Sequence, residues 1–216
     1  MNYLSFDVGI KNLAYCVITP EKDIVDWGII NLNDNPICDV TLNKKCEKQA
    51  TYLVKDDVLV NYCCTAHSKK FPKKKKLNTN HDICNLSKKC ISALRKIDLS
   101  SIKNVLIENQ PALKNPVMKS VQMIIYTFFI IEGMDEKSSI ENIHMVNARN
   151  KLKVYKGPKI ECNKKDKYAQ NKYLSVEYTK IMIITQPEKF KNLFSESKKK
   201  DDLADAYLQG IYWIEK

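Results

Sequence analysis

The sequence has no run of apolar residues long enough to cross a membrane as a helix. Its longest apolar stretch, Met123 to Ile131, falls well short of the about 20 residues that such a helix needs, and it contains Tyr126 and Thr127. The first residues also lack the charged start, the apolar segment and the cleavage site of a secretory signal peptide. Both absences argue against a membrane or exported protein and predict a soluble, intracellular chain.

Negative charge is scarce relative to positive charge. The 216 residues include 36 Lys and Arg against 25 Asp and Glu, which gives a formal net charge of +11. The excess consists almost entirely of lysine. Such a surface attracts polyanions, among which DNA and RNA are the commonest. A Lys-rich protein from an AT-rich genome would show the same balance, so charge alone does not decide between the two.

Hydrophobic patterning predicts one α/β domain with an insertion. Three strand-like runs joined by short turns open the chain, which is typical of an antiparallel meander. Further along, short strands alternate with helical patterns, which indicates a mixed sheet flanked by helices. Strands are expected at 3–8, 13–19, 24–32, 103–107 and 143–146, and helices at 81–97, 117–131, 166–184 and 201–214. Residues 33–76 are polar and are interpreted as an insertion that interrupts a domain spanning 1–216.

The insertion contains four of the eight cysteines. In a reducing compartment these residues are thiols or metal ligands rather than disulfides. Cys64 and His67 form a C-x-x-H pair, and Cys38 and Cys46 would complete a Cys3His set for a structural zinc ion. The adjacent Cys63 would serve in place of Cys64 equally well, since spacing does not separate them. Free thiols in a loop are the alternative to a zinc site.

A hairpin expected over residues 51–62 lies between the two pairs of zinc ligands, which is a zinc-ribbon-like arrangement. A small polar insertion needs a staple to fold, and this favours zinc. The C-x7-C spacing of the first pair is wider than usual and weighs against it.

Four acidic residues occupy positions where a buried carboxylate would need a partner. Asp7 lies among apolar residues of the first strand, in FDVGIKN. Glu108 ends a strand, in VLIENQP, at the edge where α/β sheets bind ligands. Asp202 and Asp205 are three residues apart and therefore share one face in the first turn of the last helix. Asp201 would replace Asp202 if the phase of that helix were shifted by one residue.

Each acid has a simpler interpretation when it is taken alone. Asp202 would cap a helix, Asp7 would cap the loop at Gly9, and Glu108 would pair with a lysine. Taken together, the acids match phosphodiester hydrolysis, in which two divalent ions roughly 3.5–4 Å apart activate water and stabilise the leaving oxygen. Magnesium prefers oxygen ligands, and we expect Asp7 to bridge the two ions.

The spaced motifs FDVGIKNL, LIENQP and DDLADAY resemble the RuvC-type branch of the RNase H-like superfamily. They are most similar to the poxvirus, iridovirus and giant-virus Holliday-junction resolvases, which are related to the yeast mitochondrial resolvase. The stretches VNARNKL (146–152) and KYLSVEYT (172–179) fit the same viral branch. The resemblance covers residues 1–32 and about 80–216. It implies an RNase H-like mixed sheet and a viral protein that processes branched or concatemeric DNA.

The resemblance also implies a mechanism and a site. The catalytic acids would be Asp7, Glu108, Asp202 and Asp205, holding two Mg²⁺ ions for which Mn²⁺ can substitute. Lys151 resembles a lysine that approaches the scissile phosphate in these enzymes, although an ordinary solvated lysine is the simpler interpretation. The enzyme would be a homodimer that cuts two opposed strands of a four-way DNA junction.

Several lysines outside the acidic motifs are candidates for contact with DNA phosphates, each adding a salt-dependent, sequence-independent affinity. They are Lys11, Lys73, Lys74, Lys75, Lys164 and Lys165. A solvated linker is the alternative interpretation of the two lysine runs. Two other functions also fit the sequence. One is a less specific nuclease acting on flaps or RNA–DNA hybrids, and the other is an inactive, zinc-bearing DNA-binding module.

Overall fold

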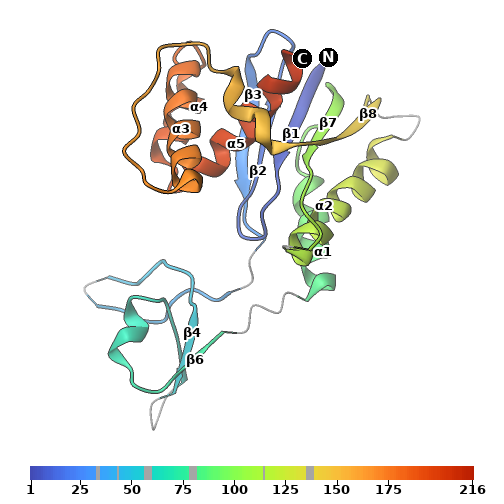
Figure 1. Ribbon diagram of the computed structural model, residues 1–216. Helices are drawn as coiled ribbons and strands as arrows, with labels where there is room; N and C mark the ends of the chain where they lie inside the picture. The colour runs from blue at the N-terminus through green and yellow to red at the C-terminus, as the bar shows by residue number, and fades with distance from the viewer. Residues whose placement is uncertain (33–34, 43, 56–59, 78–81, 114, 135–138) are drawn as a thin grey trace. The chain divides into compact units, whose positions relative to one another are not determined.

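The computed structural model describes residues 1–32, 35–42, 44–55, 60–77, 82–113, 115–134 and 139–216. The chain divides into two compact units (Figure 1). The main unit consists of Met1–Leu32 with Ile83–Lys216, and the inserted unit is Asn33–Asp82.

The main unit is built on a five-stranded mixed sheet in the order β3-β2-β1-β7-β8. The strands are β1 (Asn2–Asp7), β2 (Leu13–Ile18), β3 (Ile24–Ile30), β7 (Ile102–Glu108) and β8 (Asn142–Val146). Short turns join β1 to β2 and β2 to β3, so both pairs are antiparallel. The pairs β1–β7 and β7–β8 are parallel, and a helical crossover connects β7 to β8. The central strand, β1, therefore has an antiparallel neighbour on one side and a parallel neighbour on the other.

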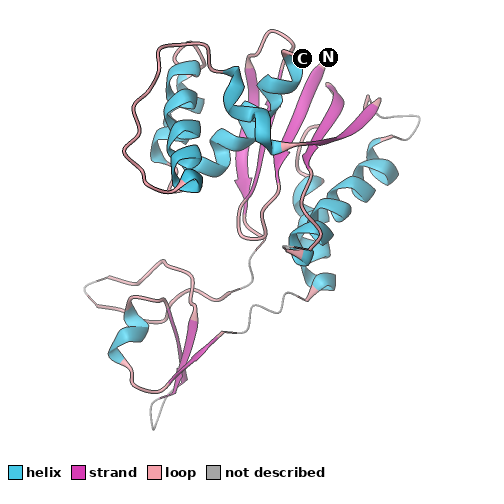
Figure 2. Ribbon diagram, viewed as in Figure 1, coloured by secondary structure: helices cyan, strands magenta, loops and turns pink. Residues whose placement is uncertain are grey.

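Helices cover both faces of this sheet (Figure 2). On one face α1 (Ile83–Leu94) and α2 (Pro116–Phe128) pack against each other and the sheet, and the π-helical turn Phe129–Gly133 continues α2. On the other face lies α5 (Lys200–Ile214), with α3 (Lys167–Met182) and α4 (Glu188–Glu196) beside it.

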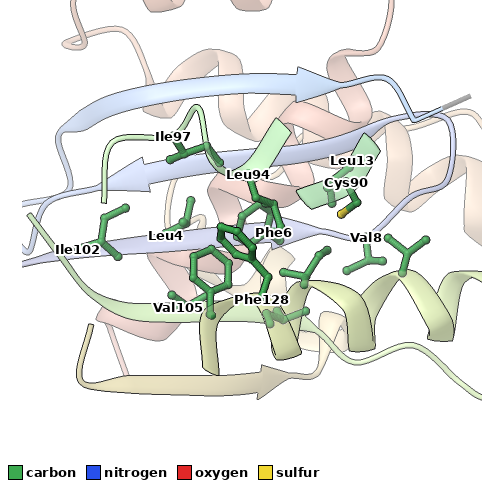
Figure 3. Packing of buried hydrophobic residues seen from close by; sticks show 14 of the residues in the cluster. Leu4, Phe6, Val8, Leu13, Cys90, Leu94, Ile97, Ile102, Val105 and Phe128 are labelled. Carbon is green, nitrogen blue, oxygen red and sulfur yellow. The ribbon is translucent and has the colours of Figure 1, made fainter. Parts of the chain in front are cut away.

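Both faces of the sheet are covered by helices, and successive side chains of a strand point to opposite faces. In β1, Leu4 and Phe6 are fully buried among the residues of α1 and α2 (Figure 3). Ser5, between them, faces the opposite side and accepts a hydrogen bond from Gln209 Nε2 of α5 at 3.1 Å. The Gln209 amide also donates to the Phe6 carbonyl oxygen at 3.1 Å, so α5 is fixed directly to β1.

The close approach of α5 to the sheet depends on Gly210. A Cβ atom at this position would lie 2.5 Å from Ile18 Cδ1 and 3.3 Å from Ser5 Cβ. A larger residue would require the Ile18 side chain to move and would contact Ser5 closely. This close approach matters because α5 carries two of the four candidate carboxylates, Asp202 in its first turn and Asp205 in the next turn rather than in the first as expected.

In the main unit, the observed strands and helices follow the expected ones, with two additions. Helix α4 was not predicted, and its buried residues are only Phe190 and Phe194. The 3-10 segment η3 (Ala148–Val154) was also not predicted, although it carries Lys151. The helix expected from His81 begins at Ile83, and His81 itself lies outside the described residues.

The inserted unit is a three-stranded antiparallel sheet in the order β5-β4-β6. Its elements are β4 (Tyr52–Lys55), β5 (Val60–Cys63), β6 (Lys74–Lys76) and the 3-10 turn η1 (His67–Lys70). Strands β4 and β5 correspond to the hairpin expected over 51–62, whose residues 56–59 lie outside the described part. Its buried apolar residues are few and small, and they include three cysteines: Cys38, Ala50, Val54, Cys63 and Cys64.

Among the described residues, no helix is both long and apolar enough to cross a membrane.

Candidate functional site

The four acidic residues singled out in the sequence line one pocket of the main unit, with a volume of about 490 Å³. Asp7 and Glu108 are the last residues of β1 and β7, two neighbouring parallel strands in which Phe6 pairs with Ile107. Their side chains therefore meet at the carboxyl edge of the sheet. Asp202 and Asp205 reach the same pocket from α5.

Asp7 lies at the centre of the acidic cluster, and only 17% of its side chain is exposed. Burial raises its pKa well above the ordinary value, and the negative charges of Glu108 and Asp205 raise it further. The charge of Lys151, whose Nζ lies 3.9 Å from Asp7 Oδ1, opposes this rise. Without a further cation, the cluster therefore resists full ionisation.

Asp202 and Asp205 each have a carboxylate oxygen that is buried without a hydrogen-bond partner among the described residues, namely Asp202 Oδ2 and Asp205 Oδ1. Such orphaned oxygens are costly unless a cation or donor satisfies them. Burial, followed by the charge of Asp201, raises the pKa of Asp202. The simpler interpretation of Asp202 as a helix cap is wrong, because the N-cap of α5 is Lys199.

Asp201, the alternative to Asp202, forms an ion pair outside the acidic cluster. It pairs with Lys172 of α3 and does not line the pocket. Although burial alone would raise the pKa of Asp201, the hydrogen bond and charge of Lys172 lower it. The geometry therefore favours Asp202.

Glu108 is held in place by donors that the sequence did not reveal. Its Oε2 accepts a hydrogen bond from Gln110 Nε2 at 2.7 Å and one from the Val8 backbone N–H at 3.3 Å. The backbone N–H of Gln110 in turn donates to Oε1 of Gln122 in α2, at 2.8 Å, and Gln122 is fully buried. Gln110 belongs to the motif LIENQP, but its partner Gln122 lies on α2, and nothing in the sequence indicated that the two residues would be in contact.

Lys151 lies inside the acidic cluster, so its interpretation as an ordinary solvated lysine is wrong. Its Nζ is 2.5 Å from Asp205 Oδ2, and 17% of its side chain is exposed. Burial alone would lower its pKa, but Asp205, Asp7 and Glu108 outweigh burial and raise it. Lys151 is therefore protonated and neutralises part of the cluster.

The rim of the pocket is basic. Lys11, Arg149, Lys172 and Tyr168 line it, and of these only Lys11 was expected from the sequence. The other lysines proposed for DNA contact do not line this pocket. Lys164 and Lys165 are exposed in the loop before α3, whereas Lys73, Lys74 and Lys75 are exposed in or next to β6 of the inserted unit.

The inserted unit brings a second set of expected ligands together. One ligand atom from each of Cys38, Cys46, Cys64 and His67 lies within 4.8 Å of all the others. Cys38 Sγ and His67 Nδ1 are 3.3 Å apart. The cluster therefore contains Cys64, and not its neighbour Cys63, as the fourth member. Four such groups at this separation can hold a metal ion.

The thiol of Cys64 has surroundings suited to a thiolate. Burial would raise its pKa, but hydrogen bonds from the backbone N–H groups of His67 and Ala66 outweigh burial and lower it. A thiolate is the form of cysteine that binds metals. The C-x-x-H turn thus supplies backbone donors as well as two ligands.

Comparison with known proteins finds viral proteins that are similar to this chain in sequence or in fold. No family model matches the chain. Uncharacterized protein L451 of Acanthamoeba polyphaga mimivirus is 31% identical in an alignment of 313 positions that covers 100% of this chain and 75% of the mimivirus protein.

Two crystal structures of the fowlpox virus Holliday junction resolvase resemble the chain over its whole length. The complex with substrate Holliday junction DNA has a TM-score of 0.52 and 16% identity, covering 100% of this chain and 97% of the resolvase. The second structure has a TM-score of 0.51 and 14% identity, with coverage of 100% and 98%. At these identities the match establishes the fold. The expected RNase H-like mixed sheet flanked by helices, and the resemblance to a poxvirus-type resolvase, are confirmed at that level.

Proposed function

The chain belongs to the same family as the uncharacterized mimivirus protein L451, and we propose from its pocket and fold that it is a magnesium-dependent endonuclease that resolves four-way DNA junctions. The observation that carries this proposal is the pocket formed by Asp7, Glu108, Asp202 and Asp205 at the carboxyl edge of β1 and β7. The fold that surrounds the pocket is the one found in the fowlpox resolvase bound to its junction substrate.

The donor set fits divalent metal ions with a preference for oxygen. All four acidic groups offer carboxylate oxygens, which Mg²⁺ and Mn²⁺ prefer. Two of these oxygens, Asp202 Oδ2 and Asp205 Oδ1, are buried without a hydrogen bond among the described residues, although Lys199 Nζ lies 3.9 Å from Asp202 Oδ2. A bound cation would satisfy both oxygens. Metal ions bound here would activate a water molecule and stabilise the oxygen that leaves the phosphorus atom.

The protein's own residues would position the reactants. Gln110 fixes one oxygen of Glu108 through a 2.7 Å hydrogen bond, and Glu108 is also hydrogen-bonded to the Asp7 side chain. Lys151 is protonated and lies beside Asp205 and Asp7, where its ammonium group would stabilise negative charge that develops on a phosphate. Lys11 and Arg149 on the rim would hold neighbouring phosphates of the bound strand.

Resolution of a junction requires two opposed cuts, and the main unit has one carboxylate pocket of this kind among its described residues. We therefore propose a homodimer, in which each protomer cuts one strand. The relatives matched here are viral, which supports a role on branched or concatemeric viral DNA.

The inserted unit is proposed to bind one structural zinc ion through Cys38, Cys46, Cys64 and His67. Three sulfurs and one imidazole are a common set of ligands for tetrahedral zinc. The unit has few buried apolar residues, so a metal ion would supply stabilisation that its core does not. Lysines in and before β6, including Lys74 and Lys75, would then be presented to DNA phosphates.

The test compares cleavage of a synthetic four-way junction with cleavage of matched linear duplex, flap and RNA–DNA hybrid in Mg²⁺. Native protein should make paired, symmetric nicks in the junction alone, and Asp7→Asn should bind the junction without cutting it. Asp98→Asn, at an exposed acidic residue outside the pocket, is the matched control and should cut normally.

Other results would select the alternatives. Equal cutting of all substrates would leave a metal-dependent nuclease but refute junction specificity. Tight binding without cutting in either Mg²⁺ or Mn²⁺ would identify a DNA-binding module. Light scattering of the native protein tests the dimer separately.

A further inference from the structure

Tyr168 combines exposure with proximity to the carboxylates. It lines the same pocket as Asp7 and Asp202, yet 68% of the residue is exposed. It lies in the first turn of α3, immediately after Lys167. Exposing an aromatic ring to water forfeits the stabilisation that its burial would bring. An exposed ring at the mouth of a candidate active site is therefore a candidate for contact with the substrate.

The Tyr168 ring is held in place by contacts that lead to α5, which carries Asp202 and Asp205. Lys172, one turn further along α3, places its Nζ 5.1 Å from the centroid of the Tyr168 ring. Lys172 also pairs with Asp201, the residue that directly precedes Asp202 in α5. The position of the Tyr168 ring is therefore coupled to the first turn of α5. A ring that is anchored in this way loses little conformational freedom when it binds a ligand.

The chemistry around Tyr168 fits a nucleotide. The carboxylates would hold metal ions and the scissile phosphate, whereas Lys11, Arg149 and Lys172 on the rim carry the positive charge that flanking phosphates require. The base attached to such a phosphate lies beside it, at the level of the rim. A base that has left a DNA helix has lost its stacking partners, and an aromatic ring at the rim of the pocket can stack on such a base.

We propose that Tyr168 forms a nucleobase-binding subsite at the rim of the pocket, where it stacks on an unstacked base next to the scissile phosphate. This inference rests on the proposed junction-cutting function and deepens it. A base inside a continuous duplex already has both faces stacked, and removing it costs energy. A base at a branch point is easier to unstack, so Tyr168 favours branched over linear DNA.

The experiment uses full-length protein carrying Asp7→Asn, so that the DNA remains intact. Four-way junctions and matched linear duplexes contain a single 2-aminopurine at successive positions around the cut. Its fluorescence rises when the base leaves the helix and falls when an aromatic ring stacks on it. Tyr168→Leu removes the ring, Tyr168→Phe keeps it, and Tyr62→Leu changes an exposed tyrosine of the inserted unit as the matched control.

At one position next to the cut, we expect quenching with Tyr168 and Tyr168→Phe, and bright fluorescence with Tyr168→Leu. Loss of stacking should also weaken junction affinity about 5- to 150-fold, which corresponds to the about 1–3 kcal/mol of one base stack. Linear duplex affinity and the Tyr62→Leu variant should be unchanged. In the cutting-competent protein, the loss should appear mainly in KM.

The inference is overturned if Tyr168→Leu binds the junction as tightly as the parent protein and gives the same fluorescence at every position. That result is distinct from failure of the proposed function, in which native protein neither prefers nor cuts the junction. Equal weakening of junction and linear duplex binding would also overturn the inference, because it would assign Tyr168 a contact that does not depend on unstacking.

Discussion

Replacing Gln122 by leucine tests whether a buried amide of α2 controls the candidate metal site. Gln122 is fully buried, and its Oε1 accepts hydrogen bonds from the Gln110 backbone N–H at 2.8 Å and from Lys119 Nζ at 3.1 Å. Gln110 in turn holds Glu108. Gln122→Leu therefore leaves the buried Gln110 N–H without a partner and frees the residue that orients Glu108, a candidate metal ligand.

Two effects of different size should follow. An unsatisfied buried amide costs about 1–3 kcal/mol. For a unit of this size, each kcal/mol lowers Tm by about 2–4 °C, so a loss of about 2–12 °C is expected. Loss of a group that orients a metal ligand typically weakens metal binding about 10- to 100-fold. The magnesium concentration for half-maximal cleavage should rise by that factor.

Both effects can be measured separately. Trp27 and Trp213, the only tryptophans of the chain, belong to the main unit, so their fluorescence reports unfolding of that unit alone. Calorimetric titration with Mn²⁺ measures metal binding without any cleavage. Ser120→Ala, also in α2, is the matched control and should change neither quantity.

A double-mutant cycle decides whether Gln122 acts through Gln110. If it does, Gln122→Leu should have little further effect on metal affinity once Gln110→Leu is present. Additive losses of affinity would refute the relay. A lower Tm with unchanged metal binding would show that Gln122 is structural only.

Three further predictions follow from the two candidate metal sites. Burial raises the pKa of Asp7, so the folded metal-free protein retains a proton there that the unfolded chain releases. Its free energy of unfolding should therefore fall as the pH rises from the ordinary pKa of aspartate through the pKa of Asp7 in the folded protein. Asp7→Asn should therefore stabilise the metal-free protein at neutral pH in urea melts, and a gain that does not vary with pH would contradict this. Lys151→Met should slow cleavage about 100-fold, because it removes the positive charge that would stabilise the phosphate. The same variant should bind Mn²⁺ more tightly, because the ammonium group no longer competes with the metal ion for Asp205. Unchanged cleavage would show that Lys151 has no part in the mechanism. Purified protein should release one zinc ion per chain to a chelator. The Cys64→Ser variant should contain no zinc, whereas Cys63→Ser should still contain one ion. The reverse pattern would assign the fourth ligand to Cys63.

Sequence patterns predicted the framework of the main unit because its signals are local. Strand ends, helix phase and turn residues can each be read within a few positions, and they led to Asp7, Glu108, Asp202 and Asp205. The short helix α4 was not predicted although Phe190 and Phe194 are one turn apart, because its apolar repeat covers little more than one turn.

Contacts between distant elements could not be predicted in the same way. Lys151 pairs with Asp205, and Gln110 with Gln122, only after the sheet and helices have packed. The choice between Cys63 and Cys64 likewise depends on how the hairpin turns into η1, and only the folded unit distinguishes the two thiols. The sequence could thus indicate which residues do chemistry more readily than which residues orient them.

The attachment of α5 to β1 has a consequence for synthesis of the protein. Gln209 contacts Ser5 across 204 positions of the chain, and β1 carries one candidate carboxylate whereas α5 carries two. A nascent chain that has not yet released α5 from the ribosome lacks half of the cluster and the helix that closes it. Under the proposed function, a fragment that ends before α5 would lack Asp202 and Asp205 and would not cut DNA.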